Sequence, residues 1–500
     1  MAKKLSFFDK AFWITETVHN PKHVASLQIL TLPENAGDDY LDNLVAEMRS
    51  FDKPVYPFGS KVKAFLGYPL ALVPAEMDME YHVQLHEIED VSDMQSLHEY
   101  AATLHETQLD RTKPLWQFTV IKSKKGRDFC IYVKIHHMIG DGATMVRWLQ
   151  AGYLEEPDSE KFRPVWAKRR KRSARTKRSK VNSILTGLWE SIITIKDILW
   201  VFVRLLFKAI RLNRHYMPIP FTGTRTVLTG QVKQGRVIST CDLDFDRVQA
   251  LSRRSRATVN EVLLCCFDIG THRFLMDYGH SFKRPLYTNM PINLRKPGEE
   301  TGGNQIAIVP VKLAHGSNDP YLRLRQIIEN HRIVKNAAKK ATPSAFSYYT
   351  VIIQTFALIF EQLHITDWMK PIANILISNV PGPKQARYLK ESRLKAIYPI
   401  STITPGGGVN ITLLTYDKTA NIGIVACNRH IKSLEPMADY FVEAFDMLEQ
   451  CIDNPDLNIE DIGEKIDEVD KAIVLDAPDE EQMGLDSLIE EEEEHASVPH

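Results

Sequence analysis

Two adjacent histidines followed by an aspartate–glycine pair are the residues of this 500-residue sequence best suited to chemistry. They lie in His136-His137-Met138-Ile139-Gly140-Asp141-Gly142, which has the pattern HHxxxDG. The preceding run, residues 129–135, alternates well enough to predict a buried strand, and a helix is expected to begin near Ala143. The histidine pair is therefore expected at the carboxyl end of a strand, where Asp141 and Gly142 turn the chain into the helix.

Three interpretations of the histidine pair are open. Either ring can be a core histidine that is satisfied by hydrogen bonds. A metal site is disfavoured because adjacent strand residues point to opposite faces, and no HExxH motif or second ligand cluster accompanies the pair. In the third interpretation one histidine faces a cleft as a general base, with Asp141 holding the turn that orients it. A neutral imidazole with a pKa near 7 suits proton transfer at cellular pH.

The elements that must position these residues indicate an α/β protein. Strand-like runs alternate with helical patterns on both sides of a compositional break, and the length allows two or three domains of about 150 residues. We expect an N-terminal domain with the HHxxxDG motif, a linker with an apolar helix, a C-terminal domain and an acidic, disordered tail. Their expected boundaries are 1–165, 166–215, 216–463 and 464–500.

Composition excludes several classes of protein. The 62 Lys and Arg balance 63 Asp and Glu, which argues against a protein basic throughout that coats nucleic acid. The hydrophobic content is too high for a disordered chain. Cysteines are few, scattered and without a CxxC pair, which is typical of a reduced intracellular protein. Asp9 and Lys10 interrupt the N-terminal apolar run, so no signal peptide is expected.

A basic run and an apolar helix follow the first domain. Residues 168–180 are mostly Lys and Arg, and residues 181–212 repeat apolar side chains every three or four positions, which predicts a helix. Glu190, Lys196 and Arg204 make a transmembrane span too costly. Two interpretations stay open. The helix is either a crossover packed on its own domains or an amphipathic helix that lies in a membrane interface, drawn to anionic lipid by the basic run.

The HHxxxDG segment resembles the active-site signature of the chloramphenicol acetyltransferase-like, CoA-dependent acyltransferases. Within this superfamily, the order of further segments resembles the wax ester synthase/diacylglycerol acyltransferase family more than the plant BAHD enzymes or the condensation domains. These segments are Pro114-Leu115-Trp116, residues 257–262, Met290 to Arg295 followed by Gly303-Asn304, Ser378 to Pro383, and Asn410 to Tyr416.

The sequence departs from the family pattern at two positions. Lys22 stands where the family usually has methionine, which is expected to alter an entrance. Glu261 replaces the usual aspartate, but Thr258 and Glu261 keep the T-x-x-E spacing of a capping box. This segment either fixes the start of a helix or has Asn260 pointing its amide at the acyl oxygen, and both interpretations are open.

The resemblance implies a fold and a set of roles. The fold would be two α/β, chloramphenicol acetyltransferase-like domains with mixed sheets flanked by helices, and an active-site tunnel at their interface. His137 would be the general base and His136 a supporting residue. Asp141, which precedes Gly142 of the motif, would orient the turn and pair with Arg295. Asn260 would be a possible oxyanion donor, and Pro114-Leu115-Trp116 is expected to serve packing.

The implied reaction transfers a long-chain acyl group from acyl-CoA, a co-substrate, to a fatty alcohol or a diacylglycerol. Wax esters or triacylglycerols would form without a covalent enzyme intermediate, a cofactor or a metal. The protein would be cytoplasmic and peripherally bound to the inner face of the plasma membrane or to lipid droplets, with no nucleic-acid partner. The alternatives are a condensation-type enzyme with an acyl-carrier-protein donor and a non-catalytic lipid-droplet or membrane-binding scaffold.

Overall fold

The computed structural model describes residues 3–5, 7–167, 196–210, 212, 218–293, 306–339 and 343–454. Several features expected from the sequence lie outside these ranges. They are the basic run 168–180, the first part of the helix expected over 181–212, the Arg295 segment and the acidic tail from 464.

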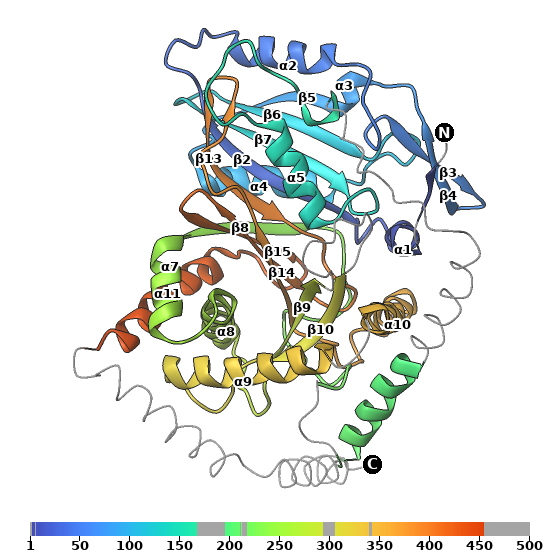
Figure 1. The fold of residues 1–500 in the computed structure, drawn as a ribbon, viewed down its shortest axis with the longest axis vertical. Helices are drawn as coiled ribbons and strands as arrows, with labels where there is room; N and C mark the ends of the chain where they lie inside the picture. The colour runs from blue at the N-terminus through green and yellow to red at the C-terminus, as the bar shows by residue number, and fades with distance from the viewer. Residues whose placement is uncertain are drawn as a thin grey trace, which may run out of the picture.

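The first mixed sheet surrounds the strand that leads to the histidine pair. Its strands are β2 (His23–Thr31), β5 (Val83–Ile88), β6 (Trp116–Ser123), β7 (Asp128–His136), β12 (Tyr388–Leu389) and β13 (Ser392–Ile400). Their order is β12-β13-β2-β7-β6-β5, with β5 parallel to β6 and the other neighbours antiparallel (Figure 1). The helical elements of this part are α2 (Tyr40–Ser50), α3 (Met79–His82), α4 (Met94–Glu106), α5 (Gly142–Gly152) and the 3₁₀ turn Val165–Ala167.

The second mixed sheet is built from later strands. They are β8 (Arg236–Asp244), β9 (Tyr287–Asn293), β10 (Ile306–Lys312), β11 (Ile375–Pro381), β14 (Val409–Tyr416) and β15 (Thr419–Cys427). Their order is β10-β9-β11-β14-β15-β8. The helices of this part are α7 (Phe245–Arg254), α8 (Val259–Asp277), α9 (Pro320–Lys339), α10 (Pro343–Gln362) and α11 (Glu435–Ile452). The two sheets with their helices confirm the predicted fold class.

Smaller elements stand beside the first sheet. A three-stranded sheet has the order β1-β4-β3, and helix α1 contacts its β4 strand. Their bounds are β1 (Lys3–Lys4), α1 (Phe7–Thr15), β3 (Ser60–Phe65) and β4 (Tyr68–Pro74). This places α1 close to the end of β7, where it takes part in the site described below.

Strand β7 is buried on both faces, not on one. Phe129, Ile131, Val133 and Ile135 belong to the core cluster on one face, as the alternation predicts. Cys130 belongs to the cluster on the opposite face. Both faces of the strand are therefore covered by other elements, while β2 and β6 pair with its two edges.

The two sheets do not divide at one point in the sequence, so the expected boundary near residue 216 does not separate them. Strands β12 and β13 come from the later half of the chain but complete the first sheet, where β13 pairs antiparallel with β2 (Figure 1). Strand β13 also packs on β14 and β15. At Gly423 of β15 a Cβ atom would lie 1.9 Å from the carbonyl oxygen of Pro399, so the backbones approach as closely as only glycine permits.

The described part of the apolar helix, residues 196–209, packs on the second part of the molecule through one face. Val201 and Leu205 are buried in a cluster with Tyr349 of α10 and strand β10. The opposite face exposes large apolar side chains, which are Leu199, Trp200, Leu206, Phe207 and Ile210. No helix in the described part of the chain is long and apolar enough to cross a membrane.

Candidate active site

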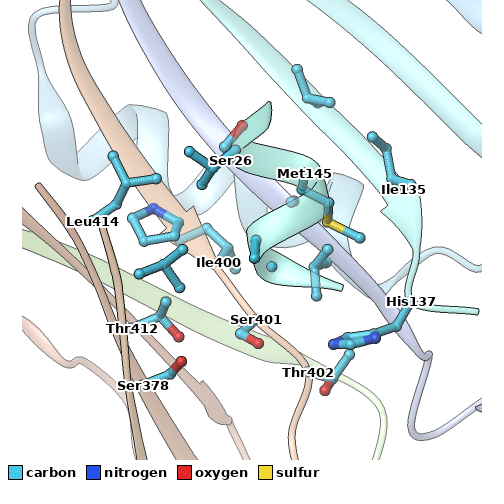
Figure 2. A pocket seen from close by; sticks show the side chains of 18 of the residues that line it. Ser26, Ile135, His137, Met145, Ser378, Ile400, Ser401, Thr402, Thr412 and Leu414 are labelled. Atoms are coloured by element: carbon cyan, nitrogen blue, oxygen red, sulfur yellow. The ribbon is translucent and has the colours of Figure 1, made fainter. Parts of the chain in front are cut away.

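A cavity of about 560 Å³ lies between the two parts of the molecule, and His137 is on its wall (Figure 2). The first part lines it with residues of α1, β2, β7 and α5. The second part lines it with residues of α10, β11, β14 and the β13–β14 connection. Most lining side chains are apolar. Such a cavity suits a long apolar chain.

His137 directly follows β7, and its backbone N–H donates to the carbonyl of Lys22 over 2.9 Å. Its ring stacks on Phe12 of α1, with centroids 4.1 Å apart and an interplanar angle of 16°. Figure 2 shows the imidazole pointing from the strand end into the cavity, toward the segment of Ser401 and Thr402. Among the described residues its buried Nδ1 has no hydrogen-bond partner.

The imidazole of His137 is neutral at physiological pH. Burial lowers its pKa to about 4, although its own backbone carbonyl and the charge of Asp141 act in the opposite direction. The neutral form that suits a general base is therefore present, because desolvation disfavours the imidazolium. A base in this state can accept a proton without first losing one.

His136 points away from the cavity into a buried polar cluster. Its Nδ1 accepts a hydrogen bond from the N–H of Met138 over 3.1 Å, and its Nε2 lies 3.5 Å from Oε2 of Glu16. Glu16 also accepts from Arg111 and from the N–H of Lys22, each over 3.0 Å. These contacts tie the strand ends of β2 and β7 to the residue that follows α1, and the supporting role of His136 in catalysis stays a prediction.

Glu16 is ionised despite its burial. Desolvation would raise its pKa, but the hydrogen bond and charge of His136, the N–H of Lys22 and the charge of Arg111 outweigh it and lower the pKa to about 2. Sequence reasoning misses Glu16 and also Phe12, since neither belongs to a recognisable motif. The only available signal is the polar Glu16 close after the apolar pattern of Phe12 and Trp13.

Asp141 caps the helix that follows the histidines. Its Oδ1 accepts from the N–H of Thr144 over 2.8 Å, and only 3% of the residue is exposed. Gly142 is the first residue of α5 and faces β11, because a Cβ there would meet the side chain of Val380 at 3.5 Å. Asp141 therefore caps helix α5 at the turn after the histidines, and its role in orienting the catalytic residue stays a prediction. Its pairing with Arg295 falls outside the described residues and stays a prediction.

The segment around Asn260 begins helix α8 with the predicted capping box. Thr258 accepts from the N–H of Glu261, and the carboxylate of Glu261 accepts from the N–H of Thr258 over 2.8 Å. Asn260 is exposed and does not line the cavity, but its Oδ1 accepts from Nδ2 of Asn379 over 2.6 Å. Asn379 does line the cavity. The helix-start interpretation is confirmed, and the oxyanion role of Asn260 stays a prediction.

Two of the matched sequence segments form one wall of the cavity. Ser378 in β11 is paired with Thr412 in the parallel strand β14, and both face the cavity (Figure 2). Asn410 accepts from the hydroxyl of Thr412 and donates to the carbonyl of Thr402, each over 2.8 Å. The sequence identifies both segments but assigns no site role to these polar residues, because the pairing of the two strands brings them together.

The Pro114-Leu115-Trp116 segment serves packing, as predicted. Trp116 is fully buried, donates from Nε1 to the carbonyl of Phe58 over 2.8 Å and stacks on Trp166. The carbonyl of Leu115 accepts from the N–H of His136 over 3.0 Å. The segment therefore supports the strand end that carries the histidine pair.

Within the described ranges, no group of three His, Cys, Asp or Glu side chains is placed to hold a metal ion.

Comparisons with known proteins agree with this arrangement. The profile of the wax ester synthase/diacylglycerol acyltransferase catalytic domain matches residues 5–263, and that of the family's C-terminal domain matches residues 302–449. The O-acyltransferase WSD of Acinetobacter baylyi is 26% identical over 89% of this chain and 96% of its own length. A probable diacylglycerol O-acyltransferase of Mycobacterium tuberculosis is also 26% identical, over 89% of this chain and 98% of its own.

Solved structures share the fold. A wax ester synthase/diacylglycerol acyltransferase from Marinobacter aquaeolei superposes with a TM-score of 0.70 at 23% identity, over 90% of this chain and 99% of that one. The starter condensation domain of rhizomide synthetase gives a TM-score of 0.55 at 10% identity, over 92% and 96% of the two chains. The profile matches cover most of the sequence and include the HHxxxDG segment. The chain therefore belongs to the wax ester synthase/diacylglycerol acyltransferase family, and it is an O-acyltransferase with the predicted two-sheet fold.

Proposed function

We propose that the protein transfers a long-chain acyl group from acyl-CoA to a long-chain alcohol or a diacylglycerol, with His137 as the general base. The imidazole takes the proton of the acceptor hydroxyl as its oxygen attacks the thioester carbonyl. The tetrahedral intermediate then expels the CoA thiolate, which receives the proton from the imidazolium. The acceptor oxygen attacks directly, so the reaction needs no covalent enzyme intermediate.

The observation that carries this proposal is a neutral, partly exposed imidazole on the wall of a largely apolar cavity. The burial of Nδ1 leaves Nε2 as the nitrogen to act as the base. The Asp141 cap and the stacked ring of Phe12 fix the direction of the imidazole. Substrates that fill this apolar cavity would exclude water and so protect the thioester from hydrolysis during the transfer.

The test is esterification by the purified full-length protein with palmitoyl-CoA, hexadecanol and diacylglycerol. We expect wax ester or triacylglycerol to form together with free CoA, and His137→Ala to lower kcat about 10²–10⁴-fold. The control is His86→Ala. His86 is a partly buried histidine that is hydrogen-bonded to Tyr100 and does not line the cavity. This variant is expected to retain activity, with a melting temperature close to that of the wild type.

Other outcomes would point to the alternatives. Unchanged esterification by His137→Ala would contradict the general-base role. Absence of esterification by the wild type with either acceptor would favour the non-catalytic scaffold. A strong preference for an acyl-carrier donor in competition with palmitoyl-CoA would favour the condensation-type enzyme. An acyl adduct on the protein after incubation with palmitoyl-CoA alone, detected by mass spectrometry, would contradict direct transfer.

We also propose that the protein works at a membrane or lipid-droplet surface. Both acceptors reside in lipid, and the outer face of the helix over residues 196–209 exposes Trp200 and Phe207. Lys196, Arg204 and Lys208 lie on the same helix and suit anionic headgroups. This combination supports peripheral binding through that helix.

A further inference from the structure

Lys22 is a buried residue that lines the cavity, and its ammonium group is hydrogen-bonded to another lining residue, Ile403. Only 4% of the residue is exposed, and its Nζ donates to the carbonyl of Ile403 over 3.1 Å. Lys22 and Ile403 both line the cavity. An ammonium group carries three donors, and in the described part of the chain only this one hydrogen bond engages them.

The carboxylates nearest to Lys22 favour its ammonium form but accept no hydrogen bond from it. Burial lowers its pKa to about 8; Glu361 and Glu16 act in the opposite direction, and Arg236 adds to the lowering. The carboxylate of Glu361 is engaged by Asn20 and by the N–H of Gly406. No carboxylate of the described residues lies within 4.0 Å of Nζ. At neutral pH Lys22 is therefore mostly in its ammonium form, and two of its three N–H donors have no hydrogen-bond partner among the described residues.

Lys22 stands next to the catalytic base. It lies just before β2, and its carbonyl accepts from the N–H of His137, which follows the neighbouring strand β7. The two residues therefore belong to the same end of the sheet. An oxygen that binds the ammonium group is expected to lie near the hydroxyl that His137 activates.

The unsatisfied donors discriminate between kinds of acceptor. A buried donor without a partner costs free energy, and a ligand that supplies an oxygen recovers it. A plain long-chain alcohol has a single oxygen, which is the reacting atom. A diacylglycerol carries an ester oxygen on the carbon adjacent to the one that bears the reacting hydroxyl. It can therefore bind Lys22 and present its hydroxyl to His137 at the same time.

We propose that Lys22 is a specificity-determining residue that selects acceptors with hydrogen-bond-accepting oxygens beside the reacting hydroxyl, the acylglycerol class, over plain long-chain alcohols. The proposal rests on the acyltransferase function proposed above and names the acceptor class of that site. This role explains why a buried ammonium group stands beside an apolar cavity, which packing alone does not explain.

The experiment measures kcat/KM for diacylglycerol and for hexadecanol with palmitoyl-CoA, using full-length wild type, Lys22→Met and Lys134→Met. For Lys22→Met we expect the ratio of diacylglycerol to hexadecanol to fall about tenfold or more. Lys134 is the matched control. It is 3% exposed, burial lowers its pKa to about 8, and its Nζ donates to the carbonyls of Leu104 and Thr107, away from the cavity. Lys134→Met should leave the ratio unchanged.

The outcomes separate this proposal from the proposed function. An unchanged ratio in Lys22→Met, or an equal loss with both acceptors, overturns the role of Lys22 and leaves the acyltransferase function standing. A wild type that esterifies neither acceptor refutes the acyltransferase function itself. If Lys22→Met does not fold, Lys22→Gln is measured in its place, because it keeps a neutral donor and is expected to lower the ratio by a smaller factor.

Discussion

His137 owes its neutral state to the way that its ring is held. The ring lies between Phe12 and the cavity, so that the charged form loses its hydration, and the nearby charge of Asp141 does not compensate. An isolated imidazole would be partly protonated in mildly acidic solution. The buried imidazole of His137 is therefore neutral over a wider pH range, and the proposed general base would be available throughout that range.

The pH profile of kcat/KM tests this state of His137. With a pKa of about 4, the base is more than nine-tenths neutral at pH 5, so we expect kcat/KM to stay nearly flat from pH 8 to pH 5 and to fall only below that. A pKa near 6.5 would instead lower the rate about 30-fold at pH 5. Steady-state kinetics with palmitoyl-CoA gives the profile, and an inflection between pH 6 and 7 would contradict it.

Protonation of Glu16 does not unfold the protein between pH 8 and pH 5, so it does not disturb the pH profile there. Its pKa is about 2 in the folded protein and 4.5 as the ordinary value, so the stability that it contributes is present above pH 4.5 and is lost as the pH falls toward 2. The control is an assay at pH 7 after incubation at pH 5. Full recovery of activity shows that any change at pH 5 is reversible titration and not unfolding.

At the scale of elements, the helix over residues 196–209 has two apolar faces with different environments. Val201 and Leu205 fill a core cluster against β10 and α10, whereas Leu199, Trp200 and Phe207 are exposed. The two interpretations that the sequence leaves open are therefore compatible in this part of the helix. Packing explains the inner face, and the outer face is available for lipid.

Substitutions on the outer face test membrane binding without opening the core. We expect Trp200→Glu with Phe207→Glu to reduce co-sedimentation with anionic liposomes about tenfold, because the charges must stay out of the headgroup interior. The matched control is Met276→Glu with Met447→Glu, since both methionines are exposed on other helices. An equal loss in the two double variants would show a general charge effect and would contradict binding through this helix.

At the scale of the whole molecule, the two sheets are joined by a close approach of strands. Gly423 in β15 lies directly against the carbonyl of Pro399 in β13. Nearby, Tyr398 donates to the carboxylate of Asp242, and Asn421 accepts from the N–H of Ile397. This junction sets the spacing of the walls that enclose the cavity, so damage to it should affect both folding and the site.

Gly423→Ala should destabilise the protein by about 2 kcal/mol or more, because the added Cβ must displace backbone at the junction. Urea unfolding followed by fluorescence measures the change. Gly152→Ala is the control, since its Cβ would meet Val165 at 3.7 Å, an ordinary contact, at the end of helix α5. Equal unfolding midpoints for the two variants would contradict the close approach.

Local features of the fold and site could be predicted from the sequence, and long-range ones could not. The strand before His136, the turn at Asp141 and the capping box of Thr258 follow from spacing within a few residues. The pairing of β13 with β2 leaves no trace in local periodicity. The contacts of Phe12 and Glu16 depend on where α1 packs, which no motif records.

The position of β13 also has a consequence for synthesis of the protein on the ribosome. Thr31, at the end of β2, and Ser392, at the start of β13, are roughly 360 residues apart, and at about 5–20 residues per second they are made roughly 20–70 s apart. During that time one edge of β2 has no partner, and an unpaired edge invites association with other nascent chains. The first sheet can be completed only when translation is nearly finished. Until then, chaperones or a temporary partner within the chain must cover that edge of β2.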